Sequence, residues 1–294
     1  IQRLVIIMKF IKMQGCGNDY VYIDCLKEQV ENEKDAAVLL SNRHFGVGSD
    51  GLILIKKGRS ADFEMVMYNP DGSRGAMCGN GIRCVARYVY DQGYIASDRF
   101  TVESMGSVKN IELFLSGNTV ESVRVDMGAP VINAADIPVV SDSKQVISRA
   151  VTLGGRNFEM TCVSMGNPHA VMFIQENPRD FELEKFGPLF ENDAMFPDRV
   201  NAEFARVLNK KEIEMRVWER GTGETLACGT GACATGVAAI LNGYTEKEVT
   251  VHLLGGDLKI GWSGAMNDPV YMTGPAEYVF TGEIALQKIR RFNI

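Results

Sequence analysis

The chain alternates between short runs of hydrophobic, β-branched and aromatic residues and loops rich in Gly, Asn, Asp and Ser. Such runs predict strands, as at residues 20–23 and 170–174. Two further stretches, 82–92 and 232–242, follow a Cys-Gly-x-Gly motif and are stopped by a glycine, which is typical of a helix that ends there. The second stretch is apolar and small-sided nearly all round, so we expect a buried helix. The pattern predicts an α+β fold.

The same sequence pattern occurs twice in the chain, at an offset of 150 residues. Cys78-Gly79-Asn80-Gly81 recurs as Cys228-Gly229-Thr230-Gly231, and the strand-like stretch 62–69 aligns with 212–219 at the same offset. Coincidence between two glycine-rich loops would not hold this register over so many positions. We therefore interpret the chain as a duplication.

The duplication predicts two similar domains related by a pseudo-twofold axis, each a curved, mostly antiparallel sheet or barrel around a central helix. We expect an N-terminal domain over residues 8–129 and a C-terminal domain over 130–277. Little chain precedes the first strand of copy one, so we expect the C-terminal segment, about 278–294, to cross back and complete the first sheet. Met8 resembles a natural start, which would make residues 1–7 an upstream extension.

Composition narrows the function classes. The chain has 294 residues, of which 46% are hydrophobic and 23% charged, as in an ordinary globular protein. A net charge of -6 with scattered Lys and Arg argues against nucleic-acid binding. No apolar run approaches the roughly 20 residues of a membrane helix, so we expect no membrane association.

Seven cysteines, an odd number without an export signal, argue against a disulfide framework and favour a reducing cytoplasm. The closest pairs, 78 with 84 and 228 with 233, do not have the C-x2-C spacing that closed zinc sites favour, so we expect no metal. The cysteines are therefore buried structural thiols or catalytic ones. Five lack the repeated context and are interpreted as packing residues: Cys16, Cys25, Cys84, Cys162 and Cys233.

Cys78 and Cys228 each precede Gly-x-Gly and a helix start. Unsatisfied N–H groups and the helix dipole at such a position are expected to lower a thiol's pKa and to bind anions. Two such thiols on facing domains would approach one carbon from opposite sides. This is what stereoinversion requires, because one thiolate removes a proton and the other thiol returns one to the opposite face.

Seven blocks, in order from Met8 to about Leu286, together resemble diaminopimelate epimerase. They are Gly17-Asn18-Asp19-Tyr20, Asn69-Pro70-Asp71-Gly72-Ser73, Met77-Cys78-Gly79-Asn80-Gly81, Ser164-Met165-Gly166-Asn167-Pro168-His169, Arg199-Val200-Asn201, Glu219-Arg220-Gly221-x-Gly223-Glu224-Thr225 and Ala227-Cys228-Gly229-Thr230-Gly231. The resemblance implies a two-domain homodimer that interconverts LL- and meso-diaminopimelate without pyridoxal phosphate or metal, in lysine and peptidoglycan-precursor synthesis. In one departure, Gly51 stands where some members carry glutamine.

The resemblance also implies residue roles. Cys78 and Cys228 correspond to the acid/base pair. The reacting carboxylate would be bound by Gly79, Asn80, Gly229 and Thr230, and the reacting amino group would lie beside Asn18. The distal end of the substrate would be held by Asn69, Asn167, Asn201 and Arg220, with Glu219 on the distal ammonium. Thiol pKa values would be adjusted by His169 and Glu219.

Other interpretations stay open. Asn69 is also a good turn residue, Glu219-Arg220 resembles an exposed ion pair, and His169 follows a turn. The nearest rival function is a proline, hydroxyproline or histidine racemase of the same two-thiol fold, which would not need the distal residues. A rival of another class is a non-catalytic thiol or metal-binding module.

Overall fold

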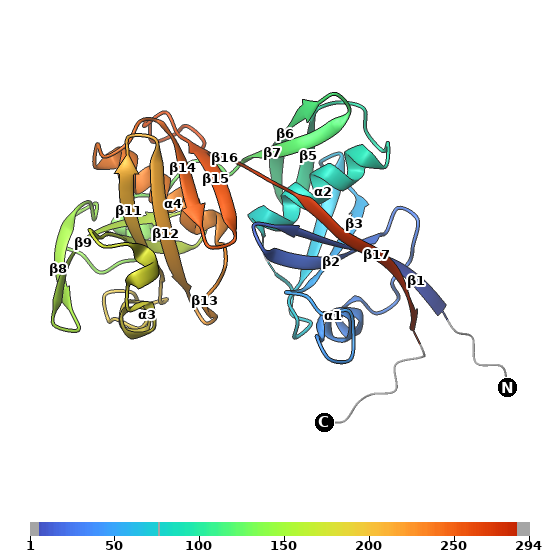
Figure 1. The fold of residues 1–294 in the computed structure, drawn as a ribbon, viewed down its shortest axis with the longest axis horizontal. Coiled ribbons are helices and arrows are strands. Elements are labelled where there is room, and N and C mark those ends of the chain that lie inside the picture. Colours follow the sequence, from blue (N-terminus) through green and yellow to red (C-terminus); the bar gives the residue numbers. More distant parts are fainter. Residues whose placement is uncertain (1–5, 76, 287–294) are drawn as a thin grey trace. The chain divides into compact units, whose positions relative to one another are not determined.

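The computed structural model describes residues 6–75 and 77–286, which form two compact units. Unit 1 comprises the described residues up to 123 and from 275 onward, and unit 2 comprises residues 124–274. Residues 1–5 of the expected upstream extension and 287–294 of the expected C-terminal segment lie outside the described residues. Among the described residues, each unit has a sheet and two α-helices (Figure 1).

The sheet of unit 1 brings the two ends of the chain together. Its strands are β17 (Glu277–Leu286), β1 (Ile6–Gly15), β2 (Asn18–Asp24), β3 (Leu52–Lys57), β4 (Phe63–Tyr68), β5 (Arg99–Ser104) and β6 (Ser107–Ser116). Neighbours in this order pair antiparallel, except for the parallel pairs β2–β3 and β4–β5. β17 lies beside β1 with Ala285 opposite Ile7, so the last described strand belongs to the first sheet. β7 (Thr119–Asp126) follows β6.

The sheet of unit 2 has the same pairing pattern. Its strands are β8 (Arg149–Leu153), β9 (Arg156–Ser164), β10 (Pro168–Phe173), β11 (Asn201–Asn209), β12 (Glu212–Glu219), β14 (Glu248–Leu253), β15 (Gly256–Gly261) and β16 (Tyr271–Gly274). The parallel pairs are again the third and fifth, β10–β11 and β12–β14, and the short β13 (Gly223–Glu224) pairs with β12. The expected fold class, two similar α+β units with mostly antiparallel sheets, is confirmed.

A central helix packs against each sheet: α2 (Gly79–Asp91) in unit 1 and α4 (Gly229–Leu241) in unit 2. Both begin three residues before the predicted starts, because the Gly-x-Gly residues are themselves helical. Each ends at a glycine with positive φ, Gly93 at 70° and Gly243 at 69°, a conformation that glycine adopts without strain. Buried alanines line α4, as its apolar sequence predicts.

The smaller helices cover the other face of each sheet. In unit 1, α1 (Glu33–Ser41) packs on β2, β3 and β4. In unit 2, α3 (Leu183–Glu191) packs on β11 and β12 over a cluster of phenylalanines. Two one-turn helices, at Ala134–Asp136 and Pro178–Asp180, complete the unit. Among the described residues, no helix is long and apolar enough to cross a membrane.

Candidate active site

In unit 1 the fold brings Cys78, Asn18 and Asn80 into contact. Cys78 is the N-cap of α2, and its Sγ accepts a hydrogen bond from Gly81 N–H at 3.3 Å. The Cys78 thiol donates to Oδ1 of Asn18 at 3.2 Å, and Asn80 Nδ2 donates to the same oxygen at 3.4 Å. Asn18 begins β2, so a strand end and a helix start meet at the thiol.

The expected lowering of the Cys78 pKa is wrong. Burial raises the pKa of the thiol above its ordinary value, and the N–H group of Gly81, the hydroxyl of Tyr20 and the guanidinium of Arg83 oppose this shift only in part. The physical reason is that desolvation disfavours the thiolate more than the donors at the helix start stabilise it.

In unit 2 the same cap holds Cys228, which is 6% exposed. Gly231 N–H donates to its Sγ at 3.4 Å, and the hydroxyl of Thr230 lies 3.5 Å from it. Glu219, at the end of β12, accepts a hydrogen bond from the hydroxyl of Thr225. Burial raises the pKa of Glu219 as well.

A fully buried pair, His169 and Glu203, lies beneath the start of α4. His169 Nδ1 is 2.6 Å from Glu203 Oε1, and both side chains are 0% exposed. His169 Nε2 faces Oδ1 of Asn167 at 3.0 Å. A Cβ placed on Gly231 would lie 2.7 Å from Glu203 Oε1, so the carboxylate touches the helix start. Burial first, and then the charges of Glu219 and Glu203, raise the pKa of Cys228 well above its ordinary value.

The predicted distal residues separate into two groups. Asn201 bridges two loops of unit 2, since its Nδ2 donates to Pro168 O at 2.9 Å and its Oδ1 accepts from Arg220 N–H at 2.9 Å. The Arg220 guanidinium donates to Asp198 O at 2.7 Å, so Arg220 and Glu219 face different partners. Asn69, in unit 1, donates to Ser73 Oγ within its own turn.

The comparison with known proteins identifies the family. A model of the diaminopimelate epimerase family matches residues 10–133 and 161–279. The diaminopimelate epimerase of Agathobacter rectalis is 52% identical over 284 residues, covering 94% of this chain and 99% of that protein. That of Methanococcus maripaludis strain S2 is 50% identical over 277 residues, covering 94% of this chain and 99% of that protein. The chain belongs to the diaminopimelate epimerase family.

Solved structures with the same fold are more distant. A phenazine biosynthesis protein of the PhzF family from Bacillus anthracis gives a TM-score of 0.69 at 15% identity, covering 96% of this chain and 100% of that one. A hydroxyproline epimerase from Agrobacterium vitis gives a TM-score of 0.65 at 12% identity, covering 97% and 93%. These likenesses show the fold alone, whereas the sequence relationship is to diaminopimelate epimerases.

Within this member of the diaminopimelate epimerase family, sequence reasoning missed two residues beside the site. Glu203 lies between apolar residues at the start of strand β11, and an ionisable residue in such a place is a signal that a buried partner exists. Asp50, after a Gly-x-Gly loop, resembles an ordinary turn residue but bonds Asn18. The structure also explains Gly51: a Cβ there would lie 2.3 Å from Tyr68 O and 2.8 Å from Cε1 of Tyr20.

The remaining cysteines, all within the described residues, differ in how deeply they are buried and take part in no disulfide. Cys16, Cys84, Cys162 and Cys233 are buried and Cys25 is partly buried. Their interpretation as packing residues stays a prediction.

Proposed function

We propose that this protein interconverts LL- and meso-diaminopimelate by proton transfer between two thiols and the substrate α-carbon. The observation that carries the proposal is the repeated cap: equivalent helices of the two units each begin with a cysteine. Membership of a family whose relatives are about half identical over nearly the whole chain supports the substrate.

In the proposed reaction Cys78 and Cys228 act on opposite faces of the reacting carbon of one substrate. One thiolate takes the α-proton, and the electron pair left behind is delocalised into the α-carboxylate. The other thiol then gives its proton to the opposite face of the carbon, so its sulfur becomes the thiolate for the reverse reaction. N–H groups at residues 79, 80, 229 and 230 would stabilise the carboxylate as it takes up charge.

Recognition of the distal end of the substrate would rest chiefly on residues of unit 2. A second zwitterionic end needs carboxylate donors and an ammonium acceptor away from the reacting carbon. Arg220 offers the donors and Glu219 the acceptor, while Asn201 holds the backbone N–H of Arg220 in place. Asn167 and Asn69 are proposed to assist as further polar groups. The proposed chemistry uses only side chains and backbone amides of this chain.

We further propose a cytoplasmic homodimer. A reducing compartment is consistent with seven cysteines none of which forms a disulfide in the structure. For the dimer, β17 supplies an apolar surface on which Tyr278, Val279 and Phe280 are 37%, 54% and 47% exposed. Sedimentation equilibrium tests the dimer directly, and a monomer at micromolar concentration would contradict it.

The decisive assay is incubation of the reduced enzyme with LL-diaminopimelate in D2O. We expect meso-diaminopimelate to form with deuterium at the inverted α-carbon. Chiral chromatography follows the isomers and mass spectrometry follows the label. Isomerisation without deuterium uptake would contradict proton transfer through thiols that exchange with solvent. If neither isomerisation nor deuterium uptake occurs, the proposed function is overturned. Proline and hydroxyproline, incubated in parallel, test the rival racemase activities.

A further inference from the structure

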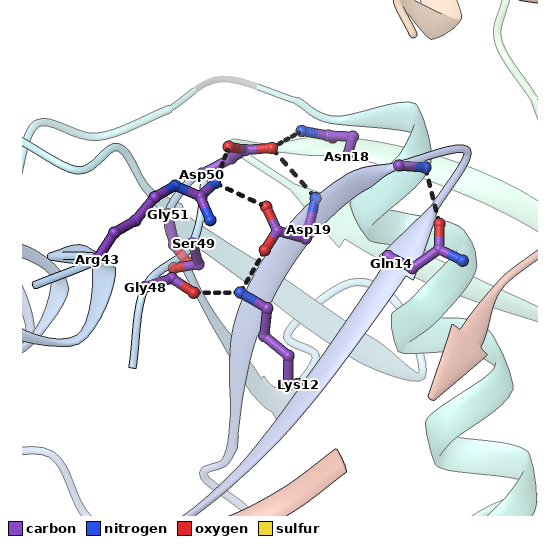
Figure 2. A network of polar contacts seen from close by, with 10 residues as sticks. Lys12, Gln14, Asn18, Asp19, Arg43, Gly48, Ser49, Asp50 and Gly51 are labelled. Carbon is purple, nitrogen blue, oxygen red and sulfur yellow. Dashed lines mark hydrogen bonds and ion pairs between the residues drawn. The ribbon is translucent and has the colours of Figure 1, made fainter. Parts of the chain in front are cut away.

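Asn18 presents opposite ends of its side-chain amide to two neighbours. Its Nδ2 donates to Oδ2 of Asp50 at 2.8 Å. Its Oδ1 accepts from the thiol of Cys78 at 3.2 Å and from Nδ2 of Asn80 at 3.4 Å. The amide therefore lies between the proposed catalytic thiol on one side and the carboxylate of Asp50 on the other, the contact that Figure 2 shows.

The chemistry of Asp50 determines which way the Asn18 amide points. An ionised carboxylate can only accept hydrogen bonds, whereas an amide side chain has one accepting and one donating end. Turning the Asn18 amide over would set its oxygen against the carboxylate and leave both without a proton to share. Asp50 thus holds the NH2 group and directs the carbonyl oxygen toward Cys78.

Asp50 is itself held by a network of charges. Its Oδ2 also accepts from Asp19 N–H at 3.1 Å, and its Oδ1 pairs with Arg43 Nη2 at 2.9 Å. The same Arg43 nitrogen lies 3.1 Å from Asp19, which also pairs with Lys12. Figure 2 shows Lys12 reaching both Asp19 and the carbonyl of Gly48, so the loop of Asp50 is tied to β1 and β2. Lys12 is 5% exposed, which places this anchor in the interior.

The equivalent position in unit 2 has no carboxylate. Leu52 pairs with Val21 in the parallel pair β2–β3, as Ala202 pairs with Ala170 in β10–β11. This register aligns Asp50 with Val200, which is 0% exposed. There the amide of Asn167 faces Nε2 of His169 at 3.0 Å. The direct orientation of an asparagine by a carboxylate at this position is therefore found in unit 1 and not in unit 2.

We propose that Asp50 is a positioning residue, which fixes the carbonyl oxygen of Asn18 to accept a hydrogen bond from the ammonium group on the reacting carbon. The inference rests on the proposed function, because it assigns that ammonium group to the space beside Cys78. A substrate ammonium can only donate, so it needs an acceptor there. An asparagine free to turn over would present its NH2 group and repel the ammonium for part of the time.

The test compares two ligands on two variants. Diaminopimelate carries an ammonium at both ends, whereas 2-aminopimelate carries one, which Glu219 would retain at the distal end. Asp50→Asn removes the carboxylate, and we expect it to lower kcat/KM for diaminopimelate about 10- to 100-fold, the range for losing a hydrogen bond to a charged group. We expect the inhibition constant of 2-aminopimelate to change by less than about threefold, because that ligand lacks the second ammonium.

Arg43→Gln is the matched control. It breaks the ion pairs of Arg43 with Asp50 and Asp19 but keeps the bond from Asn18 to Asp50. Arg43 is 57% exposed, and exposed ion pairs contribute little, so we expect kcat/KM within about threefold of the unmodified enzyme. Thermal unfolding shows whether each variant is folded. Asp50→Glu, which keeps the charge but displaces the carboxylate, replaces Asp50→Asn if the latter does not fold and should give the same selective loss.

Three results would overturn the inference. The first is unchanged kcat/KM in a folded Asp50 variant. The second is an equal loss for both ligands, which indicates general damage to the site. The third is a loss in Arg43→Gln as large as that in Asp50→Asn, which would assign the effect to the charge network. Failure of the unmodified enzyme to epimerise diaminopimelate would instead overturn the proposed function, and the inference with it.

Discussion

Cys78 and Cys228 occupy the same cap of equivalent helices, yet their surroundings carry different charge. Each Sγ accepts one N–H bond from the glycine three residues on, at 3.3 and 3.4 Å. Beneath Gly81, in the first turn after Cys78, lies the hydrocarbon of Ile53, and beneath Gly231, in the first turn after Cys228, lies the carboxylate of Glu203. The scaffold thus repeats the location of the thiol, whereas the residue under the helix decides the local electrostatics.

At three equivalent positions near the thiols, the two units differ in the same way. Aligned through the strand register, Tyr20 corresponds to His169, Ile53 to Glu203, and Asn69 to Glu219. Where unit 1 has two uncharged polar or aromatic residues and an aliphatic one, unit 2 has a histidine and two glutamates. We infer that the duplication placed one thiol at the same position in each unit, as a two-sided reaction requires. Later substitutions around the two thiols made them chemically unequal.

The largest expected effect concerns what the two sites share. We expect Cys78→Ala and Cys228→Ala each to lower kcat by at least about 10³-fold, because neither thiol can reach both faces of the carbon. Chiral chromatography of the diaminopimelate isomers measures the loss. Cys84→Ala, in the interior of α2, is the control and should keep activity if the variant is folded. Substantial turnover by either single variant would contradict a scheme in which both thiols act.

The next prediction concerns how the two sites differ. Because the pKa of Cys228 is raised well above its ordinary value and that of Cys78 is raised less, Cys78 should react with iodoacetamide at lower pH. Peptide mass spectrometry over a pH series measures each profile. Repeating the series for Cys78 in Cys228→Ala removes the coupling between the thiols. A Cys228 profile at the same pH as that of Cys78, or below it, would contradict the comparison.

The same shifts set the sign of the pH dependence of stability. A thiol whose pKa is raised by folding stabilises the protein fully below the unfolded value, about 8.5, and this stability is lost as the pH rises through the folded value. We therefore expect the melting temperature to fall above about pH 8.5. The fall should stop at a lower pH in Cys228→Ala than in Cys78→Ala, because the larger shift of Cys228 extends its contribution to higher pH. A fall that ends at the same pH in both variants would contradict the unequal shifts.

Much of this comparison could be predicted from sequence, because a duplication leaves a register that can be read directly. The repeated Cys-Gly-x-Gly motif located both helices, and the strand expected at 20–23 lies within β2. The charge difference could not be predicted in full. Glu203 acts on Cys228 through a fold that places β11 under α4, and the depth of burial that raises both thiol pKa values is a property of tertiary packing.

The roles of Asn18 and Asn69 show the same limit. Both residues stand before residues that are typical of turns or strands. From the sequence, only the family resemblance indicates that they bind the substrate. The structure places Asn18 against the thiol and Asn69 against Ser73 in its own turn. Hydrogen bonds between segments distant along the chain, such as Asn18 with Asp50, leave no local pattern that would predict them.

A smaller effect, on stability, is expected from substitutions that test the residues packed beneath the starts of α2 and α4. A Cβ on Gly231 would lie 2.7 Å from Oε1 of Glu203, which His169 holds in place, whereas one on Gly81 would lie 2.6 Å from Cδ1 of Ile53, a chain end that can move. We expect Gly231→Ala to destabilise by about 1–3 kcal/mol and Gly81→Ala by less than about 1 kcal/mol. Differential scanning calorimetry measures both. An equal or reversed order would show that Glu203 is not fixed.

The smallest expected effect comes from single groups around each sulfur. The hydroxyl of Tyr20 is one of several donors that lower the pKa of Cys78 against burial, so Tyr20→Phe should move the alkylation profile of Cys78 to slightly higher pH. Glu219→Gln removes a charge that raises the pKa of Cys228, so it should move the profile of Cys228 to lower pH. The two substitutions act in opposite directions on different thiols. If either substitution shifts the alkylation profiles of both thiols equally, the two thiols titrate as one coupled pair. The difference between their pKa values is then a property of the pair and not of each site.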